Sequence, residues 1–139
     1  MSYRIVVGVD GSEHSNTALR WALKEAECHS GTVTAVLAWQ VPFLSFPGAF
    51  DQEELEKAYK AFLIETVSAV APKPAVPLET LVAEGDPTEA MVEASKDADL
   101  LVLGIRGRSP FAGLLLGSVS QGAAATAHCP VVLVKRTDD

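Results

Sequence analysis

The chain has 139 residues, of which 48% are hydrophobic and 21% charged, and its formal net charge is −7 at pH 7. This composition suits a single globular domain, residues 1–139, with a substantial core. The acidic balance argues against nucleic acid or an anionic membrane surface as the main partner. No apolar run reaches the ~20 residues of a membrane span, and no signal-peptide layout opens the chain, so we expect a cytoplasmic protein with reduced cysteines.

The first half of the chain alternates short apolar runs with segments of helical spacing. Arg4–Val9 and Thr32–Trp39 are apolar and β-branched, which is typical of buried strands. The spacing of apolar residues between them predicts a helix, with either Ser12 or Ser15 as its cap. The Pro- and Phe-rich segment 40–50 then fits either a cover over a ligand or a plug in the core, and the sequence leaves both open.

The second half of the chain continues the same alternation. Asp51, with Glu54 three residues later, forms a capping-box pattern that opens a second helix. Three prolines end this helix near residue 72. The remaining elements are expected in the order strand, helix, strand, helix, strand: Leu78–Ala83, Asp86 to about Ala98, Leu100–Leu103, Ser118–Ala127 and Val131–Val134.

Five strands alternating with four helices predict an α/β fold. We expect an open, mainly parallel, Rossmann-like sheet with helices on both faces. In such sheets ligands bind beyond the carboxyl ends of the strands, where the strand order reverses. A 3-2-1-4-5 order would bring Asp10, after the first strand, beside Gly104, after the fourth.

The segment from Leu100 to Val134 carries the strongest functional signal. Glycines stand at 104, 107, 113 and 117, and two serines at 118 and 120 precede an alanine-rich helix. Glycines let main-chain N–H groups approach a ligand, and a helix amino terminus attracts anions. Arg106 and Arg108 lie in this loop, and no Asp or Glu occurs between Leu100 and Thr137. The pattern predicts an anion site, most simply for a nucleotide; the structural alternative is a long loop that only turns a corner.

The chain resembles the universal stress protein family. Gly104-Ile105-Arg106-Gly107, nine residues and then Gly117-Ser118 match the family's ATP-binding signature. Val7 to Ser12 and His128 to Val134 are similar to its first-strand ending and its closing segment. The resemblance implies an adenine-nucleotide α-hydrolase-like fold that binds ATP, sometimes with a divalent ion such as Mg²⁺, and a homodimer paired along Val131–Val134.

The resemblance also implies which residues contact the nucleotide. The first-strand ending would lie by the ribose and phosphates, the end of the second strand by the adenine, and the glycine loop by the triphosphate. In chain order these candidates are Val9, Asp10, Gly11, Ser12, Ala38, Trp39, Gly104, Arg106, Gly107, Arg108, Gly117, Ser118, Val119 and Ser120. Asp10 could also orient Mg²⁺ through water, and its alternative role is an Asx cap of the first loop.

These observations predict an ATP-binding, stress-response regulatory protein whose nucleotide state alters a loop, a dimer or a partner surface. Catalysis is not expected, because the phosphate loop contains no Lys, His, Glu or Asp to act as a base; slow hydrolysis stays open. The alternatives are a nucleotide-free interaction module and a receiver-type phosphoacceptor switch, for which Asp10 lacks the acidic neighbours. The sequence identifies neither the protein partner nor the triggering stress, and it does not choose among ATP, ADP and a cyclic nucleotide.

Overall fold

The structure, a computed structural model, describes residues 2–41, 51–106 and 116–135. Within these ranges the chain forms one five-stranded sheet of order β3-β2-β1-β4-β5, and every neighbouring pair of strands is parallel. The elements are β1 (Arg4–Gly8), α1 (Glu13–Cys28), β2 (Thr32–Trp39), α2 (Gln52–Val70), β3 (Leu78–Glu84), α3 (Pro87–Ala94), the 3₁₀ turn η1 (Ser95–Asp97), β4 (Leu100–Gly104), α4 (Ser118–Thr126) and β5 (Val131–Val134). The predicted order is confirmed, and it differs from the 2-1-3-4-5 order of receiver domains.

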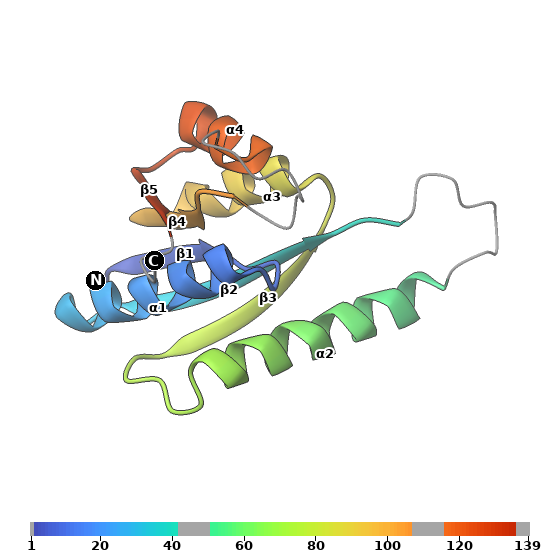
Figure 1. Cartoon of the computed structure of the whole chain (residues 1–139), viewed down its shortest axis with the longest axis horizontal. Helices are drawn as coiled ribbons and strands as arrows, with labels where there is room; N and C mark the ends of the chain where they lie inside the picture. Colours follow the sequence, from blue (N-terminus) through green and yellow to red (C-terminus); the bar gives the residue numbers. More distant parts are fainter. Residues whose placement is uncertain (1, 42–50, 107–115, 136–139) are drawn as a thin grey trace.

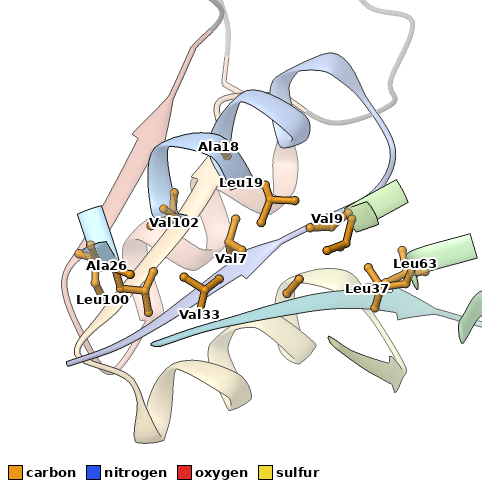
Figure 2. Packing of buried hydrophobic residues seen from close by; sticks show 14 residues of the cluster. Val7, Val9, Ala18, Leu19, Ala26, Val33, Leu37, Leu63, Leu100 and Val102 are labelled. Carbon is orange, nitrogen blue, oxygen red and sulfur yellow. The ribbon is translucent and has the colours of Figure 1, made fainter. Parts of the chain in front are cut away.

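Two helices cover each face of the sheet. Helices α1 and α2 lie on one face, and α3 and α4 on the other (Figure 1). Figure 2 shows Ala18 and Leu19 of α1 lying over Val7 of the central strand β1 and Val102 of its neighbour β4. All four side chains are fully buried, and the small alanine lets the helix approach the sheet closely. None of the helices in the described ranges is long and apolar enough to cross a membrane.

Side-chain caps begin three of the four α-helices, as the sequence indicates. Ser12 Oγ accepts the Ser15 N–H at 3.2 Å, so Ser12 is the cap of α1. Asp51 Oδ1 accepts the Glu53 N–H at 2.9 Å, and Asp86 Oδ2 accepts the Glu89 N–H at 3.0 Å. The predicted helix starts are therefore confirmed for α1, α2 and α3.

Helix α3 ends at Ala94, four residues before the position expected from the sequence. Ser95 is fully buried, and its hydroxyl donates to the Val92 carbonyl at 2.6 Å. The same hydroxyl accepts the His128 N–H at 2.9 Å, which joins the end of α3 to the turn before β5. A serine that bonds its own backbone competes with helical hydrogen bonding, and here the chain tightens into the 3₁₀ turn.

Candidate functional site

A cavity of 230 Å³ opens beyond the carboxyl ends of β1, β2 and β4, where the strand order reverses. One part of its wall is apolar and comes from strand ends and α3: Val9, Val36, Leu37, Ala38, Pro87, Met91 and Leu103. The other part consists of polar residues, glycines and the first turn of α4: Gly8, Asp10, Ser15, Gly104, Arg106, Gly117, Ser118, Val119 and Ser120. A ligand with a flat apolar part and an anionic part matches these two walls.

The polar wall is built on the amino terminus of α4. This helix begins at Ser118 behind Gly117 and has no side-chain cap and no acidic residue in its first turn. The first N–H groups of a helix have no carbonyl one turn back, and the helix dipole makes this end positive. The Gly117 N–H itself donates to the Ile105 carbonyl at 2.7 Å, so the amides that face outward begin at Ser118.

The two serines of this helix turn differ in their surroundings. Ser120 is buried, and its hydroxyl donates to the Gly104 carbonyl at 2.7 Å. Its only hydroxyl proton is therefore used within the protein, which removes it from the donors expected for a phosphate. Ser118 is exposed, and its hydroxyl stays the side-chain donor of this turn.

The loop after β1 is organised by Asp10. Its Oδ1 accepts the Ser12 N–H at 2.9 Å, and its own N–H donates to Ser15 Oγ at 3.2 Å. These contacts make the Asx turn that the sequence offered as the alternative role of Asp10, yet Asp10 also lines the cavity. Ser12 and Gly11 do not line it: Ser12 caps α1, and Gly11, at φ +85°, leaves room for the Phe62 ring.

The metal expectation rests on Asp10 alone. Within the described residues no group of three or more His, Cys, Asp or Glu side chains is placed to hold a metal ion. One carboxylate oxygen is already engaged by the Ser12 N–H. A hard cation at Asp10 would therefore take most of its ligands from water and from phosphate oxygens.

The end of β2 divides between the cavity and the core. Ala38 lines the cavity, as expected. Trp39 does not; its ring is 5% exposed and stacks on Tyr59 of α2 with ring centroids 5.6 Å apart. The Trp39 carbonyl accepts the Gly85 N–H at 2.8 Å, so its main chain is used to hold the turn after β3.

Two expected residues, Gly107 and Arg108, lie outside the described residues, as does most of the Phe-rich segment, residues 42–50. Arg106 is described and lines the cavity. Its Nη2 lies 3.5 Å from Nε2 of His14, which comes from the first turn of α1.

Sequence reasoning missed much of the apolar wall, including Met91 of α3. Only the ends of the strands were considered there, whereas the fold brings the first turns of α3 over the same edge. It also missed His14, because 92 residues separate His14 from Arg106. The placement of α3 follows from right-handed crossovers and could have been derived, but side-chain proximity could not.

Gly104 has a packing role in addition to the one its motif suggests. A Cβ there would lie 2.8 Å from both the Cβ and the carbonyl carbon of His14. The absence of a side chain lets the first turn of α1 rest against the end of β4, which is a close approach rather than a tight turn. The same glycine thereby brings His14 next to Arg106.

The chain forms a doubly wound parallel sheet, and the amino terminus of α4 lies at a cavity where the strand order reverses. This is the arrangement of α/β proteins with the nucleotide-binding type of fold. The model of the universal stress protein family matches residues 1–135, and this chain belongs to that family.

Curated relatives are identical to this chain at about a third of the aligned positions. A universal stress protein of Mycobacterium tuberculosis is 36% identical over 151 residues, covering 99% of this chain and 49% of the relative. One from Thermus aquaticus is 35% identical over 135 residues, covering 94% of this chain and 97% of the relative. The chain thus spans about half the length of the mycobacterial relative and nearly all of the other.

Solved structures of the family have the same fold. One from Lactobacillus plantarum superposes with a TM-score of 0.81 at 26% identity, covering 95% of this chain and 97% of that one. A universal stress protein in complex with cAMP gives 0.71 at 31% identity, with 96% and 97% covered. An Archaeoglobus fulgidus protein in complex with dAMP gives 0.70 at 27% identity, with 96% and 98% covered.

Proposed function

We propose that this chain is a cytoplasmic regulatory domain that binds an adenine nucleotide, with ATP as its resident ligand. The observation that carries the proposal is the two-sided cavity. Apolar side chains line this cavity together with the uncapped amino terminus of α4 and Arg106. An adenosine would lie on the apolar side and its phosphates at the amides.

Relatives support the adenine nucleotide, and the glycine signature supports ATP. Two of the solved relatives are in complex with cAMP and dAMP, which share an adenine, a sugar and one phosphate. The cavity volume of 230 Å³ lies below the range of about 300–1,000 Å³ common for small-molecule pockets, so the outer phosphates of ATP would lie outside it.

Each wall would contact a different part of the ligand. Met91 and Val36 would pack on the base, and the main chain at Ala38 would face its polar edge. Asp10 would accept from a ribose hydroxyl or hold Mg²⁺ through water. The Ser118 and Val119 amides and the Arg106 guanidinium would bind phosphate oxygens.

The regulatory step would act through the loop between β4 and α4. Its two ends are already joined, because the Gly117 N–H donates to the Ile105 carbonyl. Phosphates bound at α4 would add contacts from inside this loop and order it relative to the sheet. The nucleotide state would then change the surface that the loop presents to a partner.

Nucleotide binding is tested by titrating protein that has been stripped of small molecules with ATP, ADP, cAMP and adenosine in a calorimeter. Saturable binding of the nucleotides is expected. Gly117→Val should weaken phosphate binding by roughly tenfold, a loss of about 1.4 kcal/mol, because its side chain would project at the amides. Gly117 has φ −67° and ψ 160°, which valine adopts, so the melting temperature should hold. No saturable binding by the unchanged protein would leave the nucleotide-free interaction module as the better explanation.

We also propose that two copies pair along β5. This strand is a sheet edge and consists of four half-buried apolar residues, Val131–Val134. A flat apolar edge must be covered or paired, and a two-fold axis would pair it with its own copy.

The open edge of β5 can be tested with one substitution. On the β4 side, the Leu101 and Ile105 N–H groups donate to the Pro130 and Val134 carbonyls. Peptide groups alternate in direction along a strand, so those of Leu133 face the open edge. Leu133→Pro removes one outward N–H and should convert dimer to monomer in light scattering. Thr80→Pro, made on the opposite edge strand β3, is the matched control and should stay dimeric. A monomeric unchanged protein would contradict the proposal.

A further inference from the structure

His14 and Arg106 form a contact at the polar end of the cavity. His14 lies in the first turn of α1, and Arg106 follows the end of β4 by two residues. The Nη2 of Arg106 lies 3.5 Å from the Nε2 of His14. Arg106 lines the cavity, whereas His14 is not among its lining residues.

The chemistry of the two groups fixes the direction of this contact. A guanidinium only donates hydrogen bonds, so Nε2 of His14 must be the acceptor. The imidazole is then neutral and carries its proton on Nδ1. That Nδ1 is buried and, in the described ranges, has no hydrogen-bond partner. A buried ring nitrogen without a hydrogen-bond partner does not stabilise the fold. The contact of the ring with Arg106 therefore offers an explanation for its position.

The backbone is arranged to allow the contact. Because Gly104 has no side chain, the His14 backbone can pack against the end of β4. A Cβ on Gly104 would lie only 2.8 Å from the carbonyl carbon of His14. Ser12, two residues before His14, caps α1 and so fixes where the helix begins. The imidazole is therefore carried on a capped helix turn, which is a rigid support.

We propose that His14 is a positioning residue, which holds Arg106 toward the phosphate of the bound nucleotide and so sets the preference for phosphorylated over unphosphorylated ligand. The inference rests on the proposed nucleotide binding and deepens it. An unrestrained arginine loses rotamer freedom when it binds an anion, and a preorganised one has already lost it on folding.

The test compares cAMP with adenosine, which lacks the phosphate. The phosphodiester of cAMP keeps one negative charge near neutral pH, so protonation of the ligand does not complicate the comparison. His14→Ala should weaken cAMP binding by roughly two- to tenfold, the cost of ordering one long side chain, and adenosine binding by less than about twofold. His14→Gln, which keeps an acceptor, should restore part of the cAMP affinity.

Two further variants separate positioning from a general effect on the fold. In an Arg106→Gln background, His14→Ala should cause no additional loss of cAMP affinity, because the group it positions is gone. Thr17→Ala, one turn further along α1, is the matched control and should leave both affinities unchanged. Equal weakening of cAMP and adenosine by His14→Ala, or an undiminished loss in the Arg106→Gln background, would overturn the proposal.

A ligand-free measurement distinguishes failure of this inference from failure of the proposed function. Nitrogen-15 NMR of the His14 ring should show a proton on Nδ1 and none on Nε2 at pH 8. A proton on Nε2 would overturn the inference whether or not any nucleotide binds. With the expected tautomer and no binding of either ligand, the proposed function fails, and the positioning role fails with it.

Discussion

The Ser120 hydroxyl donates a 2.7 Å hydrogen bond to the Gly104 carbonyl, joining the first turn of α4 to the end of β4. Both residues line the cavity, so the bond fixes how far apart two of its walls stand. It also satisfies a carbonyl at the last residue of a buried strand. A residue that the sequence suggests as a phosphate donor therefore also holds two walls of the cavity together.

Ser120→Ala should destabilise the protein by about 1–3 kcal/mol, because the part-buried Gly104 carbonyl loses its partner. Ser118→Ala should change stability by less than about 0.5 kcal/mol, since its side chain is exposed. Urea denaturation followed by circular dichroism measures both. Nucleotide titration should show the opposite order, with the larger direct loss for Ser118→Ala. Equal stability of the two variants would contradict the structural role of Ser120.

Gly104→Ala should destabilise the protein by about 1–3 kcal/mol, because the added Cβ meets the backbone of His14 rather than a movable side-chain end. The first turn of α1 would have to move away from β4, and nucleotide affinity should fall with it. Thermal denaturation and nucleotide titration measure the two effects. If the variant bound nucleotide more weakly at unchanged stability, Gly104 would act on the ligand directly, as its motif alone suggests.

Local patterns in the sequence were sufficient to predict the frame of the molecule. Apolar runs gave the five strands, and Ser12, Asp51 and Asp86 marked three helix starts, because these signals depend on residues a few positions apart. The end of α3 was not predictable in this way. It depends on Ser95 and its contact with His128, 33 residues later, which no periodicity reveals.

The place of the cavity was predicted in outline for the same reason. Glycine spacing pointed to the amino terminus of α4, and strand order pointed to the sheet edge at which the cavity opens. What the sequence could not assign is the partner of each group. Ser120 bonds to Gly104, Trp39 stacks on Tyr59, and these contacts follow from packing between elements distant in the chain.

Whether Gly122→Ala raises or lowers the free energy of unfolding should depend on Thr88. Gly122 lies inside α4, where alanine favours the helix by about 1 kcal/mol, but its Cβ would lie 2.6 Å from the Thr88 methyl of α3. The single variant should be destabilised, because α3 and α4 must separate slightly. In a Thr88→Ala background the same substitution should be stabilising. Denaturation of all four proteins tests this, and additive effects would show that the two helices do not meet as described.

The thiol of Cys129 should report its surroundings through pH. Burial, then the nearby Asp99 carboxylate, raises the pKa of Cys129 above its ordinary value of 9.0, and a hydrogen bond from the Leu101 backbone lowers it by less. The folded protein therefore holds the thiol proton more tightly than the unfolded chain. The raised pKa contributes to the free energy of unfolding. This contribution is fully present below the ordinary pKa of the thiol and is lost as the pH rises through its pKa in the folded protein.

Two measurements, urea denaturation and thiol alkylation, test the raised pKa and the surroundings of Cys129. Between pH 8 and pH 10 the urea midpoint of the unchanged protein should fall further than that of Cys129→Ala. Iodoacetamide at pH 8.5 should alkylate the exposed Cys28 before Cys129, as peptide mapping would show. Asp99→Asn should speed alkylation of Cys129, because the asparagine keeps an oxygen for the Arg4 N–H but removes the charge. Faster labelling of Cys129 than of Cys28 in the unchanged protein would contradict its protected environment.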